Sequence, residues 1–375
     1  MAEQTQSYAP GTHPDMPPPS SEVGVYGWAR HNLFSSPVNA FLTFFAAYLV
    51  YLAIPPILDW VFFDGIWSGD TRAACFNEDD TRKGGGCWPF IFVWFKQIMY
   101  GRYPDEELWR INITYWIFGG GILWLLLPQT PFKKWVALFL LIPFPVICFY
   151  LFVGGSFGLV AVDTPLWGGL FLTLVIAVTG IVASLPIGII LALGRRSNMP
   201  VVRAVCVAFI ELWRGVPLIT VLFMASVMFP LFMPEGVNFD KLLRALIGVG
   251  LFSAAYMAEV VRGGLQAIPK GQFEGAEALG LNFPKMMFFI VMPQALKLVI
   301  PGIVNTFIGL FKDTTLVLII GLFDFLGMAQ LSTTNPDWLG FAVEGFVFCA
   351  AVFWVFCFSM SQYSQHLERK LHTGH

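Results

Sequence analysis

Apolar runs separated by polar connections recur along most of the chain. At about 1.5 Å per helical residue, each run is long enough to cross most or all of the roughly 30 Å hydrocarbon core of a bilayer. The runs lie at residues 39–58, 111–127, 135–153, 167–193, 206–232, 242–261, 296–320 and 341–360. This pattern predicts an all-α, polytopic membrane protein with about eight transmembrane helices.

Polar segments outside these runs predict three further regions. Residues 1–36 are rich in Pro, Ser and Gly and show no helical or strand period, so we expect a disordered arm. The connection 59–110 is the longest between two runs, and its aromatic part, 88–103, is expected to lie at the membrane surface because Lys96 stands near its centre. Residues 366–375 form a polar tail.

Basic residues set the expected orientation, because short cytoplasmic loops carry an excess of Lys and Arg. Such residues follow every second run: Lys133 and Lys134, then Arg195, Arg196 and Arg203, then Arg262, Lys270 and Lys285, then Arg369 and Lys370. The alternate connections 154–166 and 332–340 contain neither Lys nor Arg. Both termini are therefore expected in the cytoplasm, and the connection 59–110 on the outer side of the membrane.

Composition excludes several other classes of protein. Of the 375 residues, 57% are hydrophobic and 12% are charged, and the mean hydropathy is +0.69. Soluble domains carry roughly 25% charged residues, so a water-soluble fold of this size could not hide so much apolar surface. A secreted enzyme is therefore a poor fit. The net charge of −2 also provides no basic field for a nucleic acid.

The cysteines fall into two groups. Four of the six, Cys148, Cys206, Cys349 and Cys357, lie in or beside apolar runs and are expected to pack there. Cys75 and Cys87 lie in the long outer connection, beside a glycine turn. In an oxidising compartment they are expected to form a disulfide that closes a tight loop. The alternative is two free thiols in a mobile loop.

The connection 263–295 carries a spaced set of small and charged residues. In order, these are Glu274, Gly275 and Ala276, then Gly280 after three residues, and Ile290, Met292 and Pro293 after nine more. The residues predict a short helix at 271–279, entered through Pro269 and stopped by Gly280. A second helix is expected to be capped by Asn282, with Pro284 in its first turn. The alternative is a generic amphipathic helix on the membrane surface.

This spacing resembles the EAA signature of ABC-importer permeases, with Gly275 and Met292 where that signature has Ala and Leu. Three other segments resemble the same family: Glu211-Leu212-Trp213-Arg214-Gly215-Val216-Pro217, residues 256–263, and Lys312-Asp313-Thr314-Thr315-Leu316. The resemblance covers residues 166–365 and points to the polar amino-acid uptake branch. With its added N-terminal part, the chain is most similar to the larger permease of general L-amino-acid importers.

The resemblance implies a type I permease core of five helices at 166–365, with the coupling loop 263–295, preceded by a three-helix extension at 37–165 with the periplasmic loop 59–110. It implies an ATP-driven importer of L-amino acids that works by alternating access in a bacterial inner membrane. The implied partners are a homologous second permease subunit, two ATP-binding cassette ATPase subunits that hold ATP–Mg, and a periplasmic amino-acid-binding protein. The residues implied to couple this chain to the ATPase are Glu274, Gly275, Ala276 and Gly280.

Motifs for chemistry on the chain itself are missing. The dipeptide Gly-Lys never occurs, so no P-loop is present. His-Glu-x-x-His and Cys-x-x-Cys are also missing, and the five His lie near the termini. We therefore expect no catalytic residue, no metal and no cofactor on this chain, and no enzyme activity of its own.

Charged residues inside the apolar runs are costly in a bilayer and are candidates for the substrate pathway. Lys312, Asp313 and Thr314 interrupt the seventh run and offer groups for both the carboxylate and the ammonium of an amino acid. The alternative is a hydrogen-bond network between subunits. Glu344, near the outer end of the eighth run, either faces a substrate amine or lies in water at headgroup depth.

Two further pairs are spaced three residues apart, as neighbours on one helix face are. Glu211 and Arg214 either neutralise each other or act as a gate in the substrate pathway, helped by Gly215 and Pro217, which break helices. The same spacing recurs in the sixth run, where Glu259 and Arg262 are expected to form a structural pair.

An ion-gradient-driven secondary amino-acid transporter is the alternative function. It would explain the spans and the charges within them equally well. It predicts paired repeat halves with broken helices, and we find no convincing internal repeat. It also leaves the coupling-loop signature unexplained. A membrane scaffold would need no polar groups at the centre of its spans.

Overall fold

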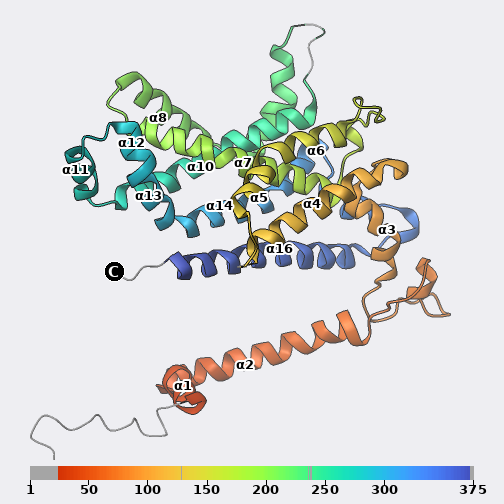
Figure 1. The fold of residues 1–375 in the computed structure, drawn as a ribbon. Helices are drawn as coiled ribbons and strands as arrows, with labels where there is room; N and C mark the ends of the chain where they lie inside the picture. Colours follow the sequence, from red (N-terminus) through yellow and green to blue (C-terminus); the bar gives the residue numbers. More distant parts are fainter. Residues whose placement is uncertain (1–23, 128, 235, 237–238, 372–375) are drawn as a thin grey trace, which may run out of the picture. The chain divides into compact units, whose positions relative to one another are not determined.

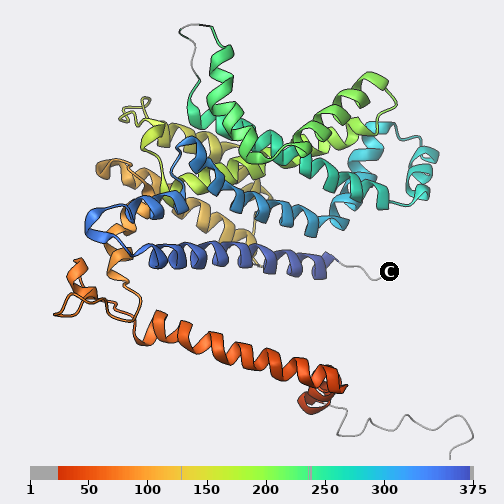
Figure 2. The same cartoon turned by 180° about the vertical axis from the view of Figure 1, so that it is seen from behind.

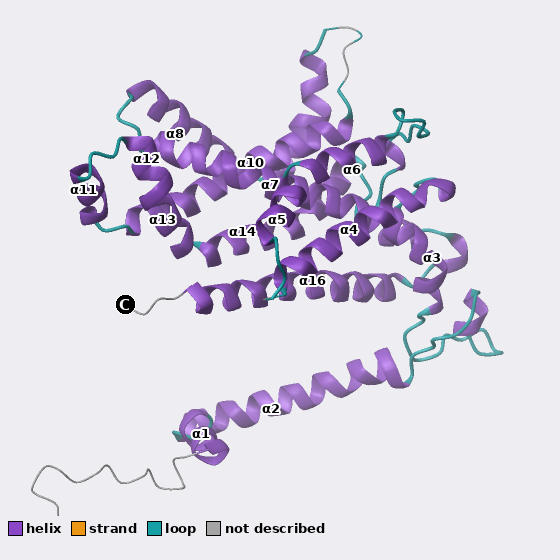
Figure 3. Cartoon of the chain, in the orientation of Figure 1, coloured by secondary structure: helices purple, strands orange, loops and turns teal. Residues whose placement is uncertain are grey.

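The structure is a computed structural model that describes residues 24–127, 129–234, 236 and 239–371. Every regular element in these ranges is a helix, drawn purple in Figure 3. Five helices are long and apolar enough to cross a membrane: Pro37–Phe63, Gly169–Arg195, Lys241–Ala267, Ile300–Ile320 and Ala342–Leu371. Two helix pairs, each bent at a short break, raise the number to seven if each pair is one span. The predicted all-α membrane fold is confirmed.

Seven of the eight predicted spans overlap these candidates. The remaining one, 111–127, corresponds to helix α4 (Leu108–Leu126), which is not among them. Arg110 and Asn112 in its first two turns lower its hydropathy. The number eight therefore stays a prediction.

The described part of the chain forms two compact units. Unit 1 comprises the described residues up to Trp67 together with Cys75–Cys87, and unit 2 comprises the rest. The helices of unit 1 are α1 (Gly24–Asn32) and α2 (Pro37–Leu58), followed by a π-helical turn (Asp59–Phe63).

Helix α2 begins where its sequence provides a cap. The Ser36 hydroxyl accepts a hydrogen bond from the Asn39 backbone N–H at 3.1 Å, and Pro37 occupies the first turn, where no N–H is needed. No residue of α2 is buried within the chain. A helix that is apolar on all sides and has no residue buried by its own unit suits a lipid environment.

The prediction of a disordered arm at 1–36 is wrong for the part of this segment that forms helix α1. Residues 1–23 lie outside the described residues, but Gly24–Asn32 is helical. This stretch contains no proline, and Arg30 lies in its last turn, where a positive charge interacts favourably with the helix dipole.

A disulfide between Cys75 and Cys87 closes a hairpin in unit 1. Inside this hairpin the Asn77 N–H donates to the carbonyl of Thr81 at 2.9 Å. The Thr81 hydroxyl and amide both donate to the Asp79 carboxylate, at 2.6 and 3.2 Å. These hydrogen bonds hold the pKa of Asp79 below its usual range, because they favour the ionised form.

Replacing Cys75 by serine is expected to loosen this hairpin. The cross-link limits the open conformations of a short loop, so cleavage within 76–86 by an added protease should become about tenfold faster. Cys87 should also react with a thiol reagent without prior reduction. Cys357→Ser, which removes a thiol from α16 in unit 2, is the matched control. Labelling of Cys87 in the unreduced wild type to the same extent would contradict the disulfide.

Unit 2 is built around helices α7 and α10. Its helices are α3 (Pro89–Tyr100), α4, α5 (Lys133–Leu141), α6 (Pro143–Val153), α7 (Gly169–Arg195), α8 (Pro200–Gly215), α9 (Leu218–Phe223), α10 (Lys241–Ala267), α11 (Lys270–Ala278), α12 (Phe283–Met286), α13 (Met292–Leu298), α14 (Ile300–Asp313), α15 (Phe325–Ser332) and α16 (Ala342–Leu371). Helices α7 and α10 pack side by side (Figures 1 and 2). A Cβ at Gly180 would come within 3.2 Å of Val249, and one at Gly188 within 2.8 Å of Met257. The residue numbers of these two contacts increase together along both helices, so α7 and α10 run in the same direction. Glycine at these positions permits their close approach.

The helices before residue 166 share an apolar core with those after it. The ring of Phe152 on α6 lies 5.8 Å from that of Trp167 and 4.7 Å from that of Phe171, between centroids. Arg110 of α4, 1% exposed, donates to the backbone carbonyl of Val160 at 2.8 Å. The predicted domain boundary after residue 165 is therefore not a boundary between compact units.

Two predicted spans are bent rather than straight. Helices α5 and α6 meet at 41° at Pro143, and α8 meets the segment Leu218–Phe232 at 101°, next to Pro217. Proline lacks the N–H that continues a helix, and its ring clashes with the preceding turn. At the other end of the chain, α16 continues to Leu371, so the predicted tail 366–375 is helical in its described part.

Helix α3 occupies the aromatic segment expected at the membrane surface. With 12 residues it is too short to span a bilayer, which needs about 20. Lys96 on this helix pairs with Asp105. Four residues of α3 are buried, and the helix packs against α7, α15 and α16.

Candidate functional site

The two short helices predicted from the spaced residues are present. Helix α11 follows Pro269, and Gly280 after its end has the left-handed φ of +74° that glycine adopts without strain. Helix α12 is capped by Asn282, whose side chain accepts from the Lys285 N–H at 3.3 Å, with Pro284 in the first turn. Both predictions are confirmed. Helices α11 and α12 lie together at one end of unit 2 (Figures 1 and 2).

Helix α11 has one packed face and one open face. Ala276 is 2% exposed and belongs to the same apolar cluster as Met286 and Met287. Glu274 and Gly275 are exposed, and a Cβ at Gly275 would meet nothing within 4 Å. The open face therefore offers a carboxylate beside a flat, small-residue surface, which suits contact with another protein.

Three polar contacts connect α11 and its neighbours to the long helices. The Arg196 guanidinium lies 5.6 Å from the centroid of the Phe273 ring on α11 and donates to the Leu265 carbonyl of α10 at 2.9 Å. The side-chain amide nitrogen of Gln294 on α13 donates to the side-chain oxygen Oε1 of Gln272 on α11 at 3.1 Å. Helix α11 is thus linked through Arg196 to α10 and to the C-terminal end of α7, and through Gln294 to α13.

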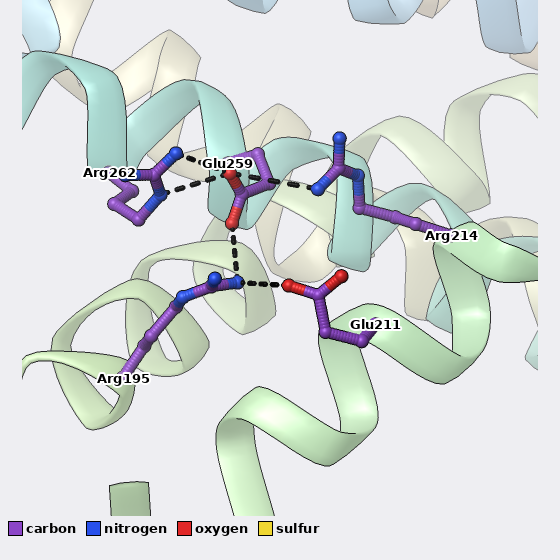
Figure 4. Close-up of polar contacts among 5 residues, drawn as sticks. All are labelled: Arg195, Glu211, Arg214, Glu259 and Arg262. Atoms are coloured by element: carbon purple, nitrogen blue, oxygen red, sulfur yellow. Dashed lines mark hydrogen bonds and ion pairs between the residues drawn. The ribbon is translucent and has the colours of Figure 1, made fainter.

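A network of five ionised side chains lies at this end of the long helices (Figure 4). Glu259 of α10, 15% exposed, is its centre. It accepts from Arg195 of α7 at 2.8 Å and from two nitrogens of Arg262 at 2.7 and 2.9 Å, and it lies 3.7 Å from Arg214 of α8. Arg195 also donates to Glu211 of α8 at 3.0 Å. The network ties α7, α8 and α10 together.

This geometry corrects one interpretation and supports another. Glu211 and Arg214 do not pair with each other, because each is closer to an opposite charge on a different helix. The expected pair of Glu259 and Arg262 is present. Arg195 was missed as a member of the network, since the sequence marks it only as one of the basic residues that set the orientation.

The other candidate residues of the substrate pathway lie outside the network. Lys312 and Asp313 end α14, where the helix gives way to the tighter turns Thr314–Ile320 inside one candidate span. The side chain of Lys312 is exposed. Thr314 is 1% exposed, and its hydroxyl donates to the Phe311 carbonyl at 2.8 Å. The hydroxyl of Thr314 is therefore already occupied within the helix.

Glu344 is fully buried in the first turn of α16. The expectation that it lies in water at headgroup depth is therefore wrong. The neighbouring Gly345 faces Phe90 of α3 and Ala329 of α15, so protein covers this turn.

The described residues contain no cluster of three or more His, Cys, Asp or Glu side chains that could hold a metal ion.

Comparison with known proteins assigns the family. Residues 184–373 match the family described as "Binding-protein-dependent transport system inner membrane component". The chain is 53% identical over 366 residues to the inner membrane amino-acid ABC transporter permease protein YhdY of Escherichia coli, covering 97% of each chain. It is 40% identical over 419 residues to the glutamate/glutamine/aspartate/asparagine transport system permease protein BztC of Rhodobacter capsulatus, covering 96% of each.

Shorter relatives match only part of the chain. The probable glutamine ABC transporter permease protein GlnP of Bacillus subtilis is 32% identical over 203 residues, which is 54% of this chain and 92% of GlnP. None of these findings supports an ion-gradient-driven transporter, and the relatives are permease subunits rather than enzymes. The chain belongs to the family of binding-protein-dependent transport system inner membrane components and is the membrane-spanning permease subunit of an ABC importer, which works with a separate ATPase and a binding protein.

Proposed function

We propose that this subunit imports L-amino acids by alternating access in a bacterial inner membrane. The names of the two relatives that match it over nearly their whole length support the substrate class, since both are amino-acid permeases. The mechanism is supported above all by helix α11, whose open face is exposed while its packed face belongs to one apolar cluster with residues of α10 and contacts Arg196 at the end of α7. ATP binding shifts the equilibrium between two arrangements of these helices only if the ATP-bound ATPase binds one arrangement more tightly than the other.

The coupling residues are Glu274, Gly275, Ala276 and Gly280. In this proposal Glu274 pairs with a basic or N–H donor group of the ATPase, Gly275 lets the partner approach closely, and Ala276 and Gly280 fix the shape of the helix. Two ATPase subunits hold ATP–Mg, and this chain binds no cofactor. A homologous second permease completes the pore, and a periplasmic amino-acid-binding protein delivers the substrate.

Residues 166–365 are proposed as the permease core and 37–165 as an extension specific to the larger type of permease. GlnP supports this division, because nearly all of that shorter permease is covered by about half of this chain. The part of this extension that lies in unit 2 packs on the core through α4 and α6, so the boundary at residue 165 marks an addition to a smaller fold rather than a flexible joint.

The orientation is proposed with α11 in the cytoplasm. The C-terminal end of α16 lies at the same end of unit 2 as α11 in both views, which supports a cytoplasmic C-terminus (Figures 1 and 2). Cys75 and Cys87 then lie in the oxidising periplasm, where a disulfide persists.

Reconstitution of the full complex tests the proposal. The chain, purified with its co-purifying subunits and placed in vesicles with the binding protein, should accumulate a labelled L-amino acid only when ATP is supplied. Uptake driven by an ion gradient without ATP would overturn it. The same assay with amino acids of different side chains tests the substrate class.

Replacing Asp313 by asparagine is expected to slow this uptake about fivefold, because an amide binds a substrate ammonium less well than a carboxylate does, by about 1 kcal/mol. Binding of the ATPase should be unchanged. Asp337→Asn, at an exposed carboxylate in the connection before α16, is the control and should transport normally. Unchanged uptake by Asp313→Asn would remove this carboxylate from the substrate pathway.

A further inference from the structure

An apolar cavity of about 820 Å³ lies between the N-terminal extension and the permease core. Its walls come from the connection 162–167 and from four helices, and they include Tyr115 of α4, Phe149 of α6, Val178 of α7 and Leu246 of α10. It lies along the first half of α7 and the first turns of α10, away from the end of α10 that leads to α11. The charged residues that line it are Asp163 and Asp240, and none of the lining residues is Lys or Arg.

Such a cavity calls for an apolar occupant. Protein interiors pack as densely as organic crystals and hold few voids larger than a water molecule. Apolar walls do not retain water, which needs several polar partners. Because α7 and α10 are both long and apolar enough to span a membrane, the surrounding hydrocarbon is lipid. An acyl chain is therefore the available group of matching chemistry.

A second, polar pocket of about 300 Å³ adjoins the first one. The two share Thr164, Pro165 and Asp240 in their linings. The polar pocket adds two cations, the exposed Lys241 and the buried Arg244. Arg244 is held in place by donating to the Ser226 carbonyl at 2.6 Å.

The two pockets together have the polarity of an amphipathic molecule. An apolar chamber continues into a small polar one in which a carboxylate, Asp240, stands beside the basic Lys241. Asp240 accepts from the Leu243 N–H at 3.0 Å and from the Thr164 hydroxyl, which leaves further lone pairs of the carboxylate for a ligand. A phosphate next to an ammonium matches this arrangement of charges.

We propose that the paired pockets bind one glycerophospholipid of the outer leaflet. Its acyl chain fills the cavity between α4, α6, α7 and α10, its phosphate contacts Lys241, and its headgroup ammonium contacts Asp240. The assignment to the outer leaflet rests on the proposed function, which places α11 in the cytoplasm. The lipid acts as a filler that joins the extension to the core.

Lipid retention by the purified complex tests this proposal. The full complex is extracted in mild detergent and exchanged into bilayers of phosphatidylethanolamine and phosphatidylglycerol. Lipid is then removed stepwise, and native mass spectrometry measures the lipid that stays bound to the complex. The wild type should keep phosphatidylethanolamine preferentially. Val178→Trp, which fills the cavity, should lower its retention about tenfold. The control Ile190→Trp, on the same helix at an exposed position that does not line the cavity, should leave retention unchanged.

A substitution in the polar pocket, at the residue proposed to contact the lipid phosphate, provides a second test that leaves the apolar cavity intact. Lys241→Gln should weaken retention about threefold to tenfold, because a charge-assisted hydrogen bond to the phosphate is lost. Lys134→Gln, an exposed lysine on α5, is the control. Equal retention of lipid by the wild type, Val178→Trp and Lys241→Gln would overturn the proposal.

Two other outcomes are distinguishable. If a helix of a partner subunit fills the cavity, Val178→Trp should release that subunit and leave bound lipid unchanged, which contradicts the proposal. Because retention is measured without transport, failure of ATP-driven uptake would overturn the proposed function and leave the binding result intact.

Discussion

Replacing Glu274 by arginine is expected to lower ATP-driven uptake about a hundredfold. The side chain lies on the open face of α11, beside a glycine that leaves room for close contact. A reversed charge at a protein interface places like charges together, which costs several kcal/mol, and about 3 kcal/mol corresponds to a hundredfold loss of binding. The ATPase should no longer co-purify with the chain, while the amount of chain in the membrane stays normal.

The control for this variant is Glu368→Arg. Glu368 is an exposed glutamate near the end of α16, at the same end of unit 2 as α11 (Figure 1). Glu368→Arg makes the same change of charge on a helix other than α11. Both uptake and ATPase binding should stay within a factor of about two of the wild-type values. Normal uptake by Glu274→Arg, or an equal loss in Glu368→Arg, would exclude a specific coupling role for Glu274.

Local sequence signals predicted α11 and α12 well because their determinants are local. Pro269 before the first helix, Gly280 after it, and Asn282 with Pro284 at the second each act on residues within one turn. The spans followed in the same way from their length and hydropathy, which need no knowledge of neighbours.

Long-range pairing could not be predicted from those signals. Arg195 and Glu259 are 64 residues apart and meet only because α7 and α10 run parallel and end at the same level. Spacing alone favoured a pair of Glu211 with Arg214, but a helical neighbour three residues away competes with stronger partners on other helices. The burial of the first turn of α16, which holds Glu344, likewise depends on Phe90 of α3, a helix that is far away in sequence.

The position of the ion network suggests how motion of α11 reaches the spans. Arg196 touches α11 through the Phe273 ring, and the adjacent Arg195 holds Glu259. These contacts link α11 to the end of α7 and, through Arg195, to α8 and α10. Glu259 forms ion pairs with three arginines, so its charge helps to hold these helix ends together.

Replacing Glu259 by glutamine is expected to separate these helix ends. Arg195 and Arg262 lose charge-assisted hydrogen bonds, which are worth about 1.5–3 kcal/mol each, and three arginines are left close together. We expect the free energy of unfolding to fall by about 3 kcal/mol, because water at this end of the helices replaces part of the lost hydrogen bonding. The melting temperature should be about 5 °C lower. Uptake should fall about thirtyfold, because displacement of α11 no longer moves α8.

Glu211→Gln is the matched control, since it makes the same substitution within the same network. The Glu211 side chain is 56% exposed and has a single partner, Arg195, so its pairing energy is at most about 1 kcal/mol. Its melting temperature should change by less than about 2 °C, and uptake should stay within about threefold of wild type. Equal effects of the two substitutions would contradict a central role for Glu259, because only the shared contact with Arg195 would then matter.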